Sequence, residues 1–217
     1  MKLSFLSSFD AFPYFTIEAV KQLLGDESIA EGTIQTALYR WMKAGLIIQL
    51  KKGLYMTRHF FELHRADGDF GPMVSAILIP QSYLSLEYVL QRYDILTDIT
   101  YPLSAITLKQ PRVFENKLGT FTYKHIKAGL YTGFTISNYL GIPFSQASLS
   151  KALFDFFYFR SLKNGDWIDV DLAEALRLNL EEFSEKDQSE FAGFVEMSQS
   201  RKMDRIFKNL KRTIWRP

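Results

Sequence analysis

The chain has 217 residues, of which 47% are hydrophobic and 23% charged, as in a folded globular protein rather than a disordered one. It contains no cysteine, which excludes disulfide bonds, cysteine-ligated metals and a cysteine nucleophile and fits a reducing cytoplasm. The first 15 residues lack the pattern of a signal peptide, and no run of about 18 apolar residues occurs. We therefore expect a cytoplasmic protein with no membrane span.

Charge is unevenly distributed along the chain, although the net formal charge is only +2. Residues 32–61 carry five basic side chains and no acidic one, and residues 198–217 carry seven basic side chains and one aspartate. Between them, residues 163–197 hold ten acidic and three basic side chains. Such asymmetry is typical of proteins that bind nucleic acid or an acidic partner surface.

Two short helices are predicted near the start of the chain. Thr16 is a suitable N-cap for a helix over residues 17–24, in which apolar side chains recur at helical spacing. A second helix is expected over residues 33–44, and Gly45 is placed to end it.

A basic β-hairpin is predicted directly after these helices. The apolar period changes to two, which indicates strands over 46–50 and 54–56 around a turn at 51–53. Helix, short turn, helix and basic hairpin is the order of a winged helix-turn-helix. Residues 1–63 are therefore predicted to be a DNA-binding domain of that type.

Residues 64–217 are predicted to form a second domain, with helices around a small mixed or antiparallel sheet. A polar, glycine-containing stretch at 64–72 marks the boundary. The fold class expected for the whole chain is α+β. The elements predicted after the boundary are helices over 73–79, 85–92, 148–162, 171–180, 184–198 and 202–212, and strands over 104–108, 119–126 and 132–144, the last broken at Gly141. Ser148 or Ser150 is expected to cap the helix over 148–162.

The polar face of the helix over 33–44 is the predicted DNA-reading surface, because the second helix of such a unit lies in the major groove. The side chains assigned to base edges are Thr33, Gln35, Thr36 and Arg40. Those assigned to phosphates are Tyr39 and Lys43 on this helix and Lys51 and Lys52 in the hairpin turn. Two alternatives stay open. The face can be merely solvated, or the unit can contact a protein without touching DNA.

A second basic surface is predicted near the end of the chain. Its members, which fall on one face of a helix, are Arg201, Arg205, Lys208 and Arg212. Phosphate contact is one interpretation. A solvated terminal helix, or a helix that pairs with the acidic block at 163–197, is the other.

The sequence carries no recognisable active site, metal centre or cofactor motif. His59, His64 and His125 have no metal-binding spacing. Asp169 and Asp171 resemble the magnesium-binding pair of a nucleotidyltransferase, but the Gly-Ser turn that such enzymes need upstream is absent. Acids at the start of a helix are the better interpretation. Neither a phosphate-binding glycine loop with a lysine nor a Gly-x-Ser-x-Gly motif occurs.

Several segments carry a resemblance to a known family. They are residues 45–47 (GLI), 52–55 (KGLY), 83–90 (YLSLEYVL), 119–126 (GTFTYKHI) and 148–155 (SLSKALFD). In order and spacing they resemble the AbiEi-type antitoxins of bacterial type IV toxin–antitoxin systems, over about residues 16–160. Val89 stands where that family usually has alanine, and Leu149-Ser150 replaces Pro-Glu.

The resemblance implies a transcriptional regulator that represses its own two-gene operon through the winged domain. It further implies that the second domain counters a nucleotidyltransferase-like toxin, not necessarily in a stable complex, and that no cofactor is needed. Lys151 and Asp155, four residues apart on the resembling helix, are expected to pair with each other in a structural role. The tail after residue 162 matches no motif of the family.

Overall fold

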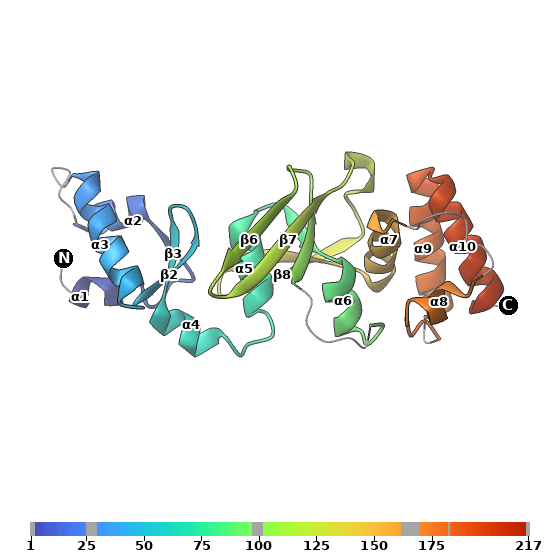
Figure 1. The fold of residues 1–217 in the computed structure, drawn as a ribbon, viewed down its shortest axis with the longest axis horizontal. Helices are drawn as coiled ribbons and strands as arrows, with labels where there is room; N and C mark the ends of the chain where they lie inside the picture. Colours follow the sequence, from blue (N-terminus) through green and yellow to red (C-terminus); the bar gives the residue numbers. More distant parts are fainter. Residues whose placement is uncertain (1–2, 25–29, 97–101, 162–169, 182, 216–217) are drawn as a thin grey trace.

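The computed structural model describes residues 3–24, 30–96, 102–161, 170–181 and 183–215. The chain is a mixed α/β protein of elongated shape, with a central sheet between an N-terminal unit and a pair of C-terminal helices (Figure 1). The predicted combination of helices and sheets is therefore confirmed. Within the described part of the chain, no helix has the length and apolar character that crossing a membrane requires.

The N-terminal unit, which runs from α1 to β3, combines short helices with a three-stranded antiparallel sheet in the order β1-β3-β2. The elements are α1 (Leu3–Leu6), η1 (Ser7–Phe9), β1 (Phe15–Thr16), α2 (Ile17–Leu24), α3 (Glu31–Lys43), β2 (Ile47–Lys51) and β3 (Leu54–Thr57). The predicted succession of helix, helix and hairpin is confirmed. The elements before α2 were not predicted, because they are too short to show a period.

Helix α3 differs from its prediction at one end. It begins at Glu31 rather than Thr33, because an acidic side chain is favourable in the first turn of a helix. It ends as predicted at Gly45, whose φ of +73° suits glycine. The Gly45 amide donates to the Met42 carbonyl at 3.0 Å, and the Leu46 amide donates to the Trp41 carbonyl at 2.9 Å, which is the Schellman pattern. Residues 25–29, where the turn between the two predicted helices falls, lie outside the described residues.

Two hydrophobic cores meet at the β2–β3 hairpin. One core joins the hairpin to the helices of the N-terminal unit, and its members include Val20, Ile34, Leu38, Trp41, Ile47 and Tyr55. The other joins the opposite side of the hairpin to the central sheet, and its hairpin members are Leu50, Leu54 and Met56. The hairpin is therefore held from both sides and is not a free arm.

The connection to the central sheet is partly helical. Helix α4 (Arg58–His64) follows β3 directly, with the Thr57 hydroxyl as N-cap accepting from the Phe60 amide at 3.1 Å. This helix was not predicted. The polar stretch at 64–72 then leads into α5 (Phe70–Leu78), which overlaps the helix predicted over 73–79.

A six-stranded mixed sheet has the order β6-β7-β5-β4-β9-β8, with parallel β5–β7 and β4–β9 pairs. Its elements are β4 (Ser82–Leu84), β5 (Leu103–Thr107), β6 (Arg112–Asn116), β7 (Gly119–His125), η2 (Ala128–Leu130), β8 (Phe134–Tyr139) and β9 (Ile142–Ala147). The predicted mixed sheet is confirmed, but it is larger than expected, because the prediction lacked β4 and β6. The strand predicted over 132–144 is the β8–β9 hairpin, which turns at Gly141.

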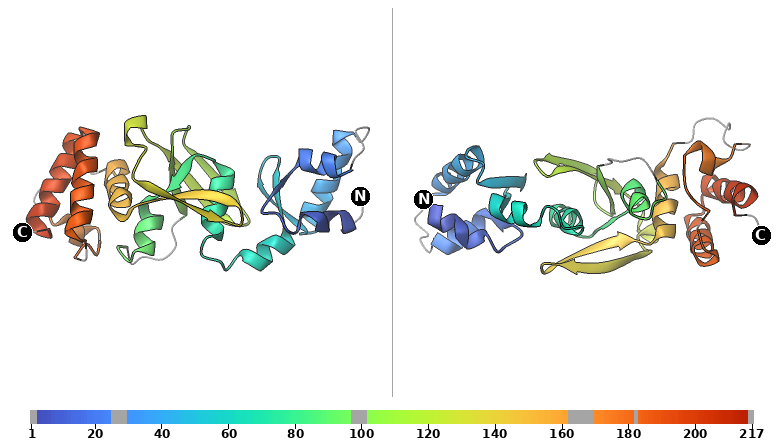
Figure 2. Two further views of the ribbon diagram at one scale, coloured as in Figure 1. Left: turned by 180° about the vertical axis from the view of Figure 1, so that it is seen from behind. Right: turned by 90° about the horizontal axis from the view of Figure 1, so that it is seen from below.

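The sheet curves around helix α5. The right-hand view of Figure 2 shows α5 between the β6–β7 ribbon and the β8–β9 hairpin. A buried contact of 3.0 Å between the Ser75 and Tyr123 hydroxyls joins α5 to β7. Helix α6 (Leu86–Arg92), predicted over 85–92, packs beside α7 (Leu149–Phe159).

The C-terminal helices pack on the far side of α7 (Figure 1). They are α8 (Leu172–Ala175), α9 (Glu185–Ser198) and α10 (Arg201–Thr213). Ser148, one of the two serines expected to cap the helix over 148–162, caps α7, and Ser184 caps α9. Helix α8 is much shorter than the predicted 171–180, since the chain turns after it and Leu178 bridges to Leu96.

Candidate nucleic-acid interface

Helix α3 buries one face and exposes the face that the sequence predicted. Ile34, Leu38 and Trp41 lie in the core of the N-terminal unit. The predicted DNA-contacting side chains of this helix are all exposed: Thr33, Gln35, Thr36, Tyr39, Arg40 and Lys43. Tyr39 exposes 62% of its surface, so its ring lies outside the core.

The exposed side chains form a ridge and two flanks. Residues 32, 36, 39 and 43 recur at three- and four-residue intervals and therefore lie along one line opposite the buried face. Thr33 and Arg40 flank this line on one side, and Gln35 lies on the other. The exposed face presents hydroxyl, amide, guanidinium and ammonium groups to an external partner.

A carboxylate that the sequence analysis missed lies at the start of α3. Glu31 Oε2 is 3.5 Å from the Lys21 ammonium, and Glu31 Oε1 accepts from the Gln35 amide at 3.2 Å. The Thr36 hydroxyl donates to the Gly32 carbonyl at 2.7 Å. These exposed contacts are weak, so Gln35 and Thr36 can exchange them for an external partner at small cost. Glu31 could have been found from its position just before the predicted helix, because acidic side chains are favoured at helix starts.

A hollow of about 540 Å³ lies against α3, where the end of α2 approaches it. It is lined by Leu24, Gly32, Thr33, Thr36, Ala37, Arg40 and Trp41. Arg40 and Lys43 make no ion pair with any described residue, although Lys21 does. Two unpaired cations therefore remain on the exposed side of the helix.

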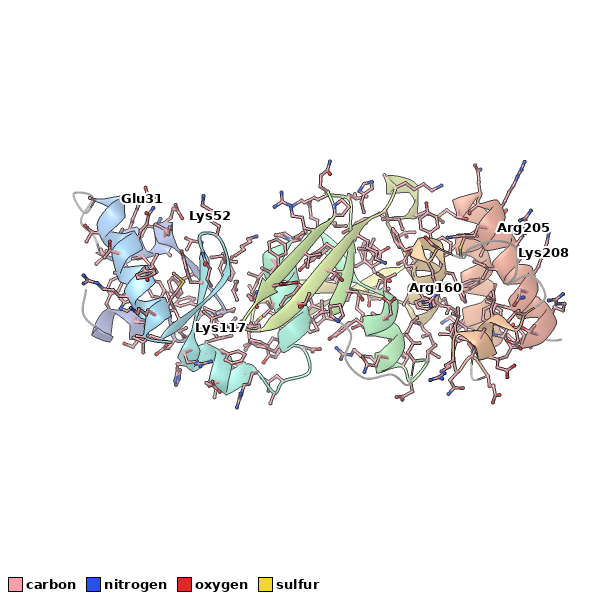
Figure 3. All side chains as sticks on the ribbon, viewed as in Figure 1. Glu31, Lys52, Lys117, Arg160, Arg205 and Lys208 are labelled. Atoms are coloured by element: carbon pink, nitrogen blue, oxygen red, sulfur yellow. The ribbon has the colours of Figure 1, made fainter. Side chains whose placement is uncertain are left out.

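The two lysines of the hairpin turn have different environments. Lys51 is half-buried, and its ammonium donates to the carbonyls of Leu78 at 2.6 Å and Ile77 at 3.4 Å, at the end of α5. The structure therefore places the Lys51 ammonium at the C-terminus of a helix, where a cation is favourable, and its contact with a phosphate stays a prediction. Lys52 is exposed at the hairpin tip, on the same edge of the molecule as Glu31 (Figure 3).

The predicted second basic surface is exposed on α10. Arg201, Arg205, Lys208 and Arg212 follow one another along one face of this helix. Lys208 pairs with Asp204 of the same helix at 2.9 Å. Arg205 and Lys208 lie at the opposite end of the long axis from Lys52 (Figure 3). The two basic surfaces are therefore separate.

Three of the residues considered for metal chemistry, His64, His125 and Asp171, have other contacts. His64 Nδ1 lies 3.1 Å from Asp67 Oδ2, and His125 Nδ1 lies 3.3 Å from the Lys109 carbonyl. Asp171 caps α8 by accepting from two backbone amides, as the helix-start interpretation predicted. Among the residues that the structure describes, no three potential metal ligands come together. Asp169 lies outside them.

Two of the family-like segments meet at a buried ion pair. Lys151 and Asp155 of α7 are fully buried and form a salt bridge, so their predicted pairing is confirmed. From the other segment, the Tyr83 hydroxyl donates to Asp155 Oδ2 at 3.0 Å, and the Ser85 hydroxyl donates to the same oxygen at 2.7 Å. The carboxylate thus receives three donors from side chains of the protein, as a buried charge requires.

Aromatic rings enclose the ammonium of this pair. The Lys151 nitrogen lies 5.4, 4.9 and 5.5 Å from the ring centres of Tyr83, Phe154 and Phe194. Burial lowers the pKa of Lys151 and raises that of Asp155, and the attraction between them offsets both shifts in part. A Cβ at Gly133 would lie 2.5 Å from the Phe194 ring, so only glycine fits there.

The chain matches no protein-family model and none of the curated proteins with which it was compared.

The different contacts of Lys51 and Lys52 lead to a testable contrast. Lys51→Ala is expected to lower the free energy of unfolding by about 1–2 kcal/mol, because it removes a charged donor from two helix-end carbonyls. Lys52→Ala is expected to change it by less than about 0.5 kcal/mol, since the side chain is exposed. Urea unfolding followed by circular dichroism measures both. Equal losses would contradict the different roles of the two lysines.

Proposed function

We propose that the chain is a DNA-binding transcriptional regulator. In this proposal residues 1–63 form a winged helix-turn-helix, with α3 in the major groove and the β2–β3 hairpin as the wing. The observation that supports it most is the exposed polar face of α3, whose Arg40 and Lys43 form no ion pair among the described residues, beside the exposed Lys52 of the hairpin tip.

The side chains of α3 divide by the chemistry that they offer. Arg40 can bond guanine at two points, and Gln35 can do the same with adenine when it leaves Glu31. Thr33 and Thr36 offer methyl groups to thymine. Lys43, Tyr39 and Lys52 contact the sugar–phosphate backbone, which fixes the position of the helix without reading sequence.

The proposed biological role rests on the resemblance to AbiEi-type antitoxins. In this role the protein represses its own toxin–antitoxin operon, and residues 64–217 form the antitoxin domain that counters a nucleotidyltransferase-like toxin. The buried cluster around Asp155 cannot contact a partner, because its groups are inaccessible. In this proposal it only stabilises the second domain.

Fluorescence anisotropy of the full chain on labelled DNA tests the proposal. One duplex comes from upstream of the protein's own gene, and the other has the same composition in scrambled order. Tighter binding to the first is expected, together with an affinity that falls as salt rises, by about 0.9 in log K per log salt for each phosphate contact. Equal, weak binding to both duplexes would refute the proposal and would favour a protein-contact role for this unit.

A further inference from the structure

A second group of cations converges where the hairpin meets the central sheet. A hollow of about 350 Å³ lies beside the buried end of Lys51 and is lined by Lys51, Pro80, Lys109, Gln110, Arg112 and Phe114, among others. Lys109 lies between β5 and β6, and Arg112 is the first residue of β6, so the hollow combines residues from the hairpin with residues of the sheet. The sequence analysis missed it, because its members are far apart in the chain.

The hollow is positively charged and has no internal counter-charge. None of the described residues that line it is acidic. Lys109 and Arg112 make no ion pair within the described part of the chain. Glu115 on β6 is an odd number of residues from Arg112, so it lies on the opposite face of the strand. Together with burial, the charges of Lys109 and Arg112 lower the pKa of Lys51.

The framework of the hollow is held in place before any ligand arrives. The Lys109 amide donates to the Thr107 hydroxyl at 3.2 Å, and the same hydroxyl donates to the Gln81 carbonyl at 3.3 Å. On the hairpin side, the Asn116 amide group donates to the Leu50 carbonyl at 3.1 Å and ties β6 to β2. Both walls are therefore fixed, and Lys51 is anchored between them by the helix-end carbonyls.

We infer that this junction is a binding site for a phosphate group, held by Lys109 and Arg112 over the fixed positive charge of Lys51. Arginine offers a planar pair of donors to phosphate oxygens, and lysine adds a point charge. A bound anion also relieves the repulsion among the three cations. The phosphate can belong to a free ion or nucleotide, or to the backbone of nucleic acid. The second source rests on the proposed function.

Two measurements on the full chain separate these sources. The first is the thermal unfolding midpoint in sodium phosphate or adenosine monophosphate, compared with sodium chloride of equal ionic strength. The second is the salt dependence of binding to the scrambled duplex. The test variant is Lys109→Ala/Arg112→Ala. The matched control is Lys117→Ala/Lys186→Ala, which also removes two exposed cations.

If the site binds a free phosphate, sodium phosphate or adenosine monophosphate is expected to raise the unfolding midpoint of the wild type and of the control variant. The test variant is expected to show no such rise. For a nucleic-acid phosphate, the slope of log K against log salt is expected to fall by about 1.8 in the test variant alone. A test variant that matches the control in both measurements overturns the inference. The proposed function fails separately, when the wild type binds its upstream duplex no better than the scrambled one.

Discussion

Replacing Asp155 by alanine is expected to lower the free energy of unfolding by about 3–5 kcal/mol. The change leaves the fully buried Lys151 ammonium without its counter-charge and removes the acceptor of the Tyr83 and Ser85 hydroxyls. Domains of this kind are stable by only about 5–15 kcal/mol, so a large part of the total is lost. Urea unfolding at neutral pH, followed by circular dichroism, measures the loss.

The chain contains a matched control for this change. Asp204 and Lys208 form a pair with the same four-residue spacing on α10, but both side chains are mostly exposed. Asp204→Ala is therefore expected to cost at most about 1 kcal/mol. The double change Lys151→Met/Asp155→Leu is expected to be less destabilising than Asp155→Ala, because it leaves no unpaired charge. Similar losses for Asp155→Ala and Asp204→Ala would contradict the account of the buried pair.

The buried cluster affects how variants of the second domain are interpreted. The segments 83–90 and 148–155, which carry much of the family resemblance, meet at Asp155 and not at a surface. A substitution in this cluster is expected to lower the stability of the sheet and of α7, because its side chains contact each other and not a partner. Loss of the proposed toxin neutralisation in such a variant therefore needs an accompanying measurement of stability before the loss is assigned to binding.

The sequence predicted the elements whose pattern is local. Helix α2, the β2–β3 hairpin and α9 each contain a full cap, turn or apolar period within their own residues. Strand β4 has only three residues, and β6 is an exposed edge strand with charged side chains, so neither shows the alternation of a half-buried strand. Their positions are decided by the strands beside them, which no local pattern reveals.

The candidate interface also could be predicted only where its pattern is local. The exposure of α3 follows from helical period alone, and the structure agrees at each predicted position. The role of Lys51 could not be deduced in this way, because its carbonyl partners at Ile77 and Leu78 are far along the chain. Lys109 and Arg112 were missed for the same reason. Positive charge is visible in a sequence, but what it faces is a tertiary property.

The double change Arg40→Ala/Lys43→Ala is expected to weaken binding to the upstream duplex by about 2–4 kcal/mol, or roughly 30- to 1,000-fold. In the proposed complex, Arg40 would supply a two-point base contact of about 1–3 kcal/mol, and Lys43 would supply a phosphate contact. Both side chains are exposed and unpaired within the described residues, so stability is expected to stay within about 0.5 kcal/mol of the wild type. Anisotropy titrations at fixed salt, beside urea unfolding, measure the two quantities.

The ratio of affinities for the upstream and scrambled duplexes distinguishes sequence-specific base recognition from nonspecific binding to phosphates. Arg205→Ala/Lys208→Ala removes the same two residue types from α10, at the other end of the molecule (Figure 3). If α10 also contacts DNA, this control weakens binding to both duplexes equally, since phosphate contacts carry no sequence information. Only the α3 variant is expected to lower the ratio. An unchanged ratio in Arg40→Ala/Lys43→Ala would mean that α3 does not read bases, whatever its effect on affinity.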